Sequence, residues 1–192
     1  MEYPSYFCSE LSLFLPNPIP LSPQLQRLFD NLEADRHWLL DQVRPLSAEQ
    51  FNRAAPGTWS LSQILSHLIT AERLSRLYMN KKILGIQQAG NTGIWEEIKM
   101  VVVKLSQRLP FKFTAPKVVV ENTPHYAEFT QLASDWEKER AELKKLLETF
   151  SDPQLKRKIY CHIRAGRLNI QHALIFFREH HIHHWPQIKR LL

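Results

Sequence analysis

The sequence predicts an all-α protein, a bundle of long helices, and three observations support this fold class. Apolar residues recur every three or four positions over long stretches, which is the pattern of amphipathic helices. Helix-start signals precede two of these stretches. Only five glycines occur in 192 residues, which argues against a turn-rich all-β chain. Long amphipathic helices joined by short or medium loops pack as a helical bundle.

The first helix follows a proline-rich segment, residues 1–21, which is expected to form an extended N-terminal arm. Ser22 and Pro23 fit an N-cap followed by a proline in the first helical position. From there the apolar stripe continues to about Val43. We expect residues 22–192 to form a single domain, a length that allows one substantial core.

A second helix is predicted to begin after Ser60, which forms a capping box with Gln63, and to end before Gly85 or Gly90. Three further helices are expected at about residues 93–109, 126–150 and 169–191.

The connections between these helices carry weaker signals. The stretch between the first two helices, and the one before the last helix, are expected to be connectors. Residues 110–124 look extended and loop-like. Within them "KVVVE" could form a short strand, although prolines on both sides argue against a packed sheet.

The net charge of +6 raises the question of nucleic-acid binding. The basic residues are scattered, however, and the densest stretch, residues 155–167, contains no known DNA- or RNA-binding motif. Such runs usually form solvated surface, so nucleic acid is not an expected partner.

The N-terminal region and the cysteines bear on location. The apolar run "LSLFLPNPIPL" is short and broken by prolines, and it indicates neither a signal peptide nor a membrane span. Cys8 and Cys161 do not form a C-x-x-C pair. We therefore expect no disulfide framework and a reducing cytoplasm as the location.

Four histidines cluster near the C-terminus in "EHHIHHW". At about 100° per residue, His184 lies on the same side of its helix as Phe177 and points into the bundle. His180 lies about 40° to one side of it and His181 about 60° to the other. His183 lies about 100° away, at the edge of the apolar face. Either His180 or His181 could therefore chelate one ion together with His184.

A third inward histidine, His67, lies on the predicted second helix, within about 60° of Ile64 and Ala71. Three imidazoles from two helices could hold a divalent metal ion and leave coordination positions open. Glu72 lies about 140° around the helix from His67 and is a poor ligand candidate. Two other interpretations stay open from these patterns alone: a hydrogen-bonded core histidine, and a pH-sensitive histidine surface.

Two motifs resemble those of the DinB-like superfamily, which includes YfiT-like proteins and thiol-dependent transferases. "TWSLSQILSHLITAER" is similar to its W-S-x-x-x-h-x-x-H-L signature. "RAGRLNIQHALIFFREHHIHHWPQIKRL" resembles its G-R-L … H-x-x-x-H-x-x-Q-I ending. The positions that match are Trp59, Ser60, His67, Leu68, Gly166, Arg167, Leu168, His180, His184, Gln187 and Ile188.

The resemblance implies a four-helix bundle, often dimeric, with a metal triad of His67, His180 and His184 that binds one zinc or nickel ion. Gln187 and His181 are then candidates for side chains that support the ligands. The chain departs from the family pattern at His162, which Ile163 follows where the family often has proline. Pro186, inside the last helix, is a second departure and is expected to cost a backbone hydrogen bond.

The resemblance also implies a function. We expect a metal-dependent enzyme that acts on a small molecule, either by hydrolysis or by transfer of a low-molecular-weight thiol used as co-substrate. The alternative is a non-catalytic metal-binding or stress-related binding module. A homodimer is the expected assembly; Ile175 and Ile182, predicted on the outer face of the last helix, offer a small independent indication.

Overall fold

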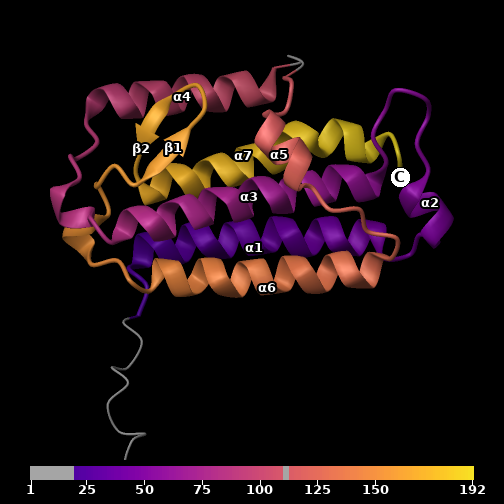
Figure 1. The fold of residues 1–192 in the computed structure, drawn as a ribbon, viewed down its shortest axis with the longest axis horizontal. Coiled ribbons are helices and arrows are strands. Elements are labelled where there is room, and N and C mark those ends of the chain that lie inside the picture. Colours follow the sequence, from indigo (N-terminus) through magenta and orange to yellow (C-terminus); the bar gives the residue numbers. More distant parts are fainter. Residues whose placement is uncertain (1–19, 110–112) are drawn as a thin grey trace, which may run out of the picture.

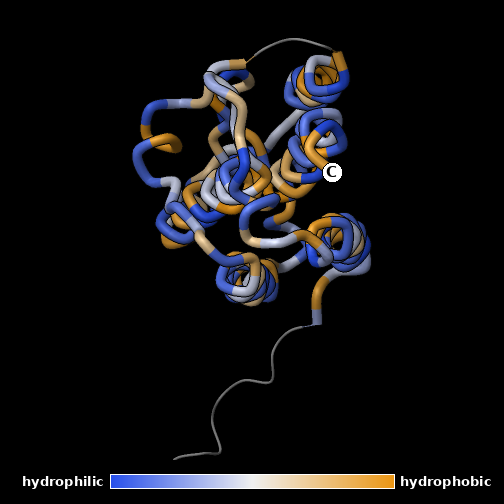
Figure 2. The backbone as a smooth tube through the Cα atoms, turned by 90° about the vertical axis from the view of Figure 1, so that its right-hand side faces the viewer, coloured by the Kyte–Doolittle hydropathy of each residue, from blue (hydrophilic) through white to orange (hydrophobic). Residues whose placement is uncertain are grey.

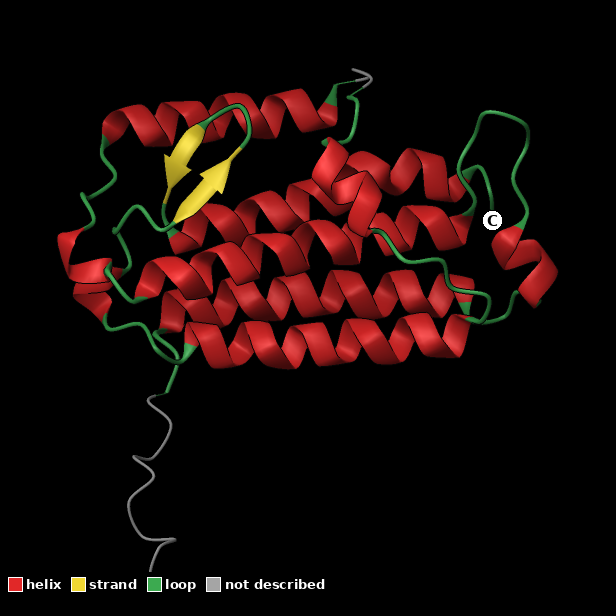
Figure 3. Ribbon diagram, in the orientation of Figure 1, coloured by secondary structure: helices red, strands yellow, loops and turns green. Residues whose placement is uncertain are grey.

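A computed structural model of the chain describes residues 20–109 and 113–192, so all but the last two residues of the predicted N-terminal arm lie outside the described part. Within this part the protein is mostly helical, with one small hairpin (Figures 1 and 3). The helices are α1 (Pro23–Val43), α2 (Ala48–Asn52), α3 (Leu61–Ile83), α4 (Ile94–Arg108), α5 (Lys117–Asn122), α6 (Phe129–Leu147) and α7 (Ile170–Lys189). Two short 3-10 turns lie at Ile86–Gln88 and Asp152–Gln154, and strands β1 (Tyr160–His162) and β2 (Gly166–Leu168) form the hairpin.

The predicted helix starts are confirmed by their hydrogen bonds. The Ser22 hydroxyl accepts a hydrogen bond from the backbone N–H of Leu25 at the start of α1. At the start of α3, Ser60 and Gln63 form the reciprocal capping box. These side chains satisfy backbone donors that the helix itself leaves without partners, so local sequence alone was enough to locate both starts.

Three connections differ from their predicted form. The connector after α1 contains a short helix, α2, which starts with a capping box of Ser47 and Gln50. The "KVVVE" segment forms helix α5 instead of the expected extended loop or short strand. The connector before α7 contains the antiparallel hairpin, in which Tyr160 pairs with Leu168. Its turn depends on Gly166, whose φ of 74° is readily adopted only by glycine.

The four longest helices lie side by side (Figure 1). Helix α1 packs against α6 and α7, and α3 packs against the same two helices. Helix α4 lies outside this group and packs along α7. Seen from the side in Figure 2, hydrophobic and hydrophilic residues alternate around the turns of each helix, as amphipathic helices require.

Helix α7 is covered more completely than its sequence pattern predicted, because α1, α3 and α4 all pack against it. The outer-face prediction for Ile175 and Ile182 is therefore wrong: both side chains are half-buried. Pro186 lies inside α7, and the helix continues past it to Lys189.

The buried core is divided into two apolar halves. One half contains Leu25 of α1 and Phe177 of α7, and the other contains Leu39 of α1 and Ile188 of α7. In each of the four long helices, buried polar residues occupy the positions between these halves: Arg36, Glu72, Arg76, Glu139, Arg140, Glu179, His181 and His184. A polar layer thus crosses the middle of the molecule, at the level of the predicted metal ligands.

None of the helices in the described ranges combines the length and the apolar composition that crossing a membrane would require.

Candidate metal centre

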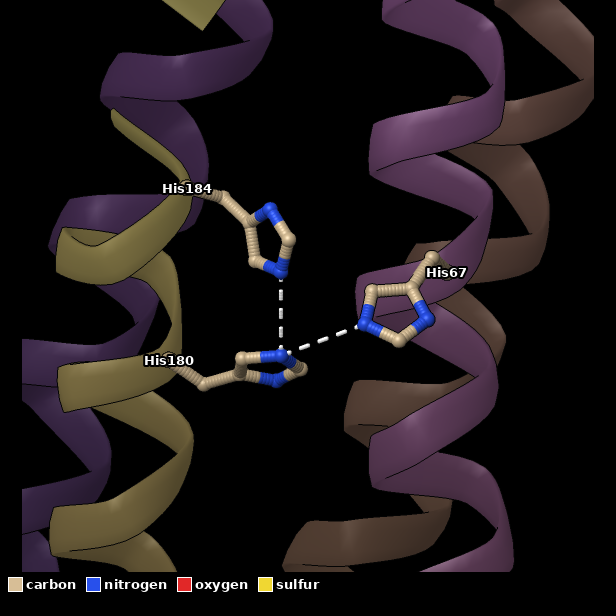
Figure 4. Close-up of side chains that lie close together, drawn as sticks. All are labelled: His67, His180 and His184. Carbon is tan, nitrogen blue, oxygen red and sulfur yellow. Dashed lines mark hydrogen bonds between the residues drawn. The ribbon is translucent and has the colours of Figure 1, made fainter. Parts of the chain in front are cut away.

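His67, His180 and His184 converge at one point between α3 and α7 (Figure 4). The two histidines of α7 are one helical turn apart, so their rings project from the same face toward α3. His180 Nε2 lies 3.2 Å from His67 Nε2 and 3.1 Å from His184 Nε2. The structure therefore brings the three histidines together, each offering a nitrogen within 4.8 Å of the other two.

These separations fit a shared metal ion. Two nitrogens that each lie about 2.0–2.1 Å from a tetrahedral ion are about 3.3 Å apart. The two shorter distances in the cluster are close to this value. Among the residues that the structure describes, the cluster contains imidazoles alone, without a carboxylate or a thiolate. A three-nitrogen donor set leaves at least one position for another ligand.

Gln187 fixes the protonation of one ring. Its Oε1 accepts a hydrogen bond from His184 Nδ1 over 2.6 Å. A neutral imidazole carries a single N–H, so the Nε2 of His184 is left with a free lone pair directed into the cluster. This is the arrangement in which a metal-binding histidine is held by a second hydrogen bond.

The cluster has too few protons for its nitrogen–nitrogen contacts, and this also favours a bound cation. With His184 Nε2 unprotonated, its contact with His180 needs the proton to be on His180 Nε2. That same nitrogen also faces His67 Nε2, so one proton must be shared between two neighbours. An ion at the centre would interact with all three lone pairs at once.

Burial keeps these rings neutral. Desolvation lowers the pKa of His67 to about 4. Desolvation also lowers the pKa of His184 to about 3, and Gln187 opposes the shift only in part. The pKa of His180 lies well below 6.5, first because of desolvation and then because of the other histidines. Neutral imidazole is the form that binds a metal, so all three are in the ligand form at pH 7.

His181 does not join the cluster. Its Nε2 lies 2.8 Å from Glu72 Oε1, and its ring packs edge-on against Trp136. Glu72 also accepts from Arg140 Nη2 at 3.0 Å, and all three of these polar side chains are buried. Glu72 thus faces α6 and His181, away from the three histidines, as its helical angle predicted.

His183 and His162 have structural partners of their own. His183 Nδ1 donates to the carbonyl oxygen of Gln107 at 2.9 Å, which ties α7 to α4. His162 is buried in the hairpin, where its Nδ1 accepts from the backbone N–H of Ala165 at 3.1 Å. Its ring packs against Phe176, which in turn stacks on His180. The histidine that departs from the family pattern therefore supports the cluster through one intervening ring.

A pocket of about 180 Å³ opens beside His67. It is lined by Trp59, Gln63, His67, Val120, Thr123, Pro124 and His125. The Trp59 ring lies 5.1 Å from the His67 ring and parallel to that of His184 at 6.4 Å. The pocket wall thus combines an aromatic face with small apolar and uncharged polar groups, and it contains no Lys, Arg, Asp or Glu.

The sequence patterns assigned no role in the pocket to its other wall residues, Trp59, Val120, Thr123, Pro124 and His125. Trp59 stands directly before the N-cap of α3, and nothing in the helical period places its ring against a residue two turns further on. Thr123 and His125 follow helix α5, a segment that was expected to be a loop. Only the tertiary fold brings this segment to the mouth of the pocket.

The fold and the site together define a helical protein with a three-histidine cluster suited to a metal ion. The DinB superfamily matches residues 31–188, and the chain belongs to this superfamily. Comparisons with curated proteins and with solved structures gave no match.

Proposed function

We propose that this protein is a metal-dependent enzyme that acts on a small molecule, by thiol transfer or by hydrolysis. The observation that carries the proposal is the convergence of three neutral Nε2 atoms beside a pocket. His67, His180 and His184 would hold one divalent ion, zinc or nickel, in the middle of a four-helix bundle of the family's type, which α1, α3, α6 and α7 would form.

The chemistry would be supplied by the ion, which when bound lowers the pKa of a coordinated water or thiol and so generates a nucleophile at neutral pH. Gln187 would hold the His184 ring in the orientation for binding. Trp59 would cover one side of the site and limit the entry of water. The substrate would enter through the pocket beside His67.

The pocket limits the class of substrate. A volume of about 180 Å³ suits a small molecule or one arm of a larger one. Trp59 offers a flat apolar surface, and Thr123 and His125 offer hydrogen-bonding groups. The free, exposed thiol of Cys161 is consistent with a reducing cytoplasm, which would also supply a low-molecular-weight thiol.

Elemental analysis of untagged protein tests the metal site. We expect about one divalent ion per chain in the wild type, and loss of that ion in His67→Ala and His184→Ala. His37→Ala, which removes an exposed histidine of α1, is the matched control and should retain the ion. Full occupancy in both site variants would refute the assignment.

Chelation separates an enzyme from a binding module whose ion is structural. The bundle has its own apolar core, so removal of a catalytic ion should lower the melting temperature by only a few degrees and leave the helical content intact. Binding energy of a structural ion is folding energy, so its removal would unfold the chain. Unfolding on chelation would favour the module.

A further inference from the structure

Helix α4 is apolar on two opposite faces. One face, with Met100 and Val103, is buried against the rest of the protein. The other face is exposed and carries Ile94, Trp95, Ile98, Val101, Val102, Leu105 and Leu109, which we call the α4 stripe. At about 100° per residue the stripe is centred opposite the buried face. A helix that is apolar on both sides has a second surface to cover.

The stripe is larger than ordinary surface variation explains. Ile94 is 74% exposed and Trp95 is 70% exposed. Seven large side chains at such exposures present roughly 700 Å² of contiguous apolar surface, while the largest patch on a typical monomer is about 300–600 Å². A standard protein interface buries about 800 Å² on each partner, so the α4 stripe alone nearly supplies one. Helix α4 also lies along the outer edge of the molecule (Figure 1), where a second body can approach it.

The order of residues in the stripe indicates which partner fits. Apart from Trp95, the stripe is symmetric about its middle, which falls between Val101 and Val102. Antiparallel packing about a two-fold axis at this point places Ile98 against Leu105 of a second copy, and the ends of the stripe meet in the same way. Every apolar position of the stripe except Trp95 then has an apolar counterpart, as an interface that uses the same patch on both copies requires. Trp95 comes opposite Arg108 of the second copy.

Charges beside the stripe agree with the same arrangement. Glu97 and Lys104 lie on one flank of α4, separated by about two turns. In the antiparallel pairing this flank of one copy adjoins the same flank of the other, and Glu97 comes within about 3 Å of Lys104 of the second copy along the helix axis. The Glu97 side chain is 64% exposed, although it also contacts His172, so it is accessible for this pairing.

We propose that two copies of this chain associate through the α4 stripe, antiparallel and centred between Val101 and Val102. The interface lies on the far side of α7 from α1, and it does not involve Ile175 and Ile182, the half-buried residues of α7 that the sequence had suggested as a partner surface.

The oligomeric state of the full chain tests the proposal. Light scattering should give twice the chain mass of 22.6 kDa at micromolar concentration. Val101→Glu places two carboxylates at the centre of the interface, and the dimer dissociation constant should rise on the order of 30-fold or more. Leu84→Glu, at a site that is 90% exposed and outside the α4 stripe, is the control and should remain dimeric. Circular dichroism should show both variants folded, because neither position is in the core.

Disulfide trapping tests the register. In a background with Cys8→Ser and Cys161→Ser, chains carrying Ile98→Cys mixed with chains carrying Leu105→Cys should form covalent dimers on oxidation. Either variant alone should not, because equivalent positions would be about 10 Å apart along the helix, beyond disulfide reach.

Three outcomes would overturn the proposal. One is a wild-type chain that is monomeric at 100 µM. The stripe would then have another occupant, such as residues 1–19 or a lipid surface. Another is a dimer that Val101→Glu does not weaken. The third is a dimer that forms no mixed disulfide, which would assign the interface to another face or register.

Discussion

His184 and Gln187 form a hydrogen bond of 2.6 Å within one turn of α7, and this bond sets the direction of the His184 lone pair. The Nδ1 proton is committed to the glutamine oxygen, so Nε2 faces His180 and His67 unprotonated. Gln187 therefore holds His184 in the form that would bind a metal ion.

Removing this bond should weaken metal binding. In Gln187→Ala the His184 ring can rotate and change tautomer, and zinc affinity should fall by about 10- to 100-fold in a competition titration. Gln187→Glu retains an acceptor and should bind within a few-fold of the wild type. Lys189→Ala, exposed on the same helix, serves as the control. Unchanged affinity in Gln187→Ala would show that the bond has no part in binding.

Glu72 should prove essential for stability and irrelevant for metal content. Glu72→Ala leaves Arg140 and His181 buried without their acceptor, which should cost about 3–5 kcal/mol of unfolding free energy in urea denaturation. The folded fraction should still contain about one ion per chain. Glu121→Ala removes an exposed carboxylate and should cost less than about 1 kcal/mol. Loss of metal from folded Glu72→Ala would mean that Glu72 is a ligand after all.

The unfolding free energy of the metal-free chain should depend on pH through His162. Burial lowers the pKa of His162 to about 4, so between pH 6.5 and 4 the unfolded chain binds a proton that the folded chain does not. Stability therefore falls as the pH falls through this window, by up to about 1.4 kcal/mol per pH unit for this group.

His162→Asn isolates that contribution. The asparagine oxygen can accept the same backbone hydrogen bond from Ala165 but does not titrate, so the variant should lose less stability between pH 6.5 and 4. His37→Asn, at an exposed site, should follow the wild-type curve. A variant curve parallel to the wild type would contradict the assignment.

Tryptophan fluorescence can report the position of the ion. Cobalt and nickel quench nearby indole rings, and Trp59 lies 5.1 Å from the His67 ring, so adding either ion should reduce emission. Trp59→Phe should lose most of this change. Trp95→Phe, on exposed α4, should retain it. Equal quenching in both variants would indicate binding at a different place.

The parts of the fold that could be predicted are those with local signals. Ser22, Ser60 and Gln63 act within one turn of their own helices, so their sequence neighbours suffice to define them. The "KVVVE" segment was misjudged because β-branched valines favour strands, whereas the structure gives it a single helical segment after Pro116 with Val119 buried. Tertiary context decided its form.

In the candidate site, too, local sequence predicts some features and the tertiary fold decides the others. Helical periodicity found the inward direction of His67 and His184, because direction is a local property. It could not choose between His180 and His181, since both lie near the apolar face. The choice depends on Glu72, 109 residues from His181 in sequence, which provides that ring with a partner away from the cluster.

A crystal structure with anomalous data at the zinc and nickel edges would locate the metal ion directly. We expect one anomalous peak per chain, bound by the Nε2 atoms of His67, His180 and His184 at about 2.0–2.1 Å. A metal elsewhere, or one bound by His181 or Glu72 in place of this triad, would contradict this assignment.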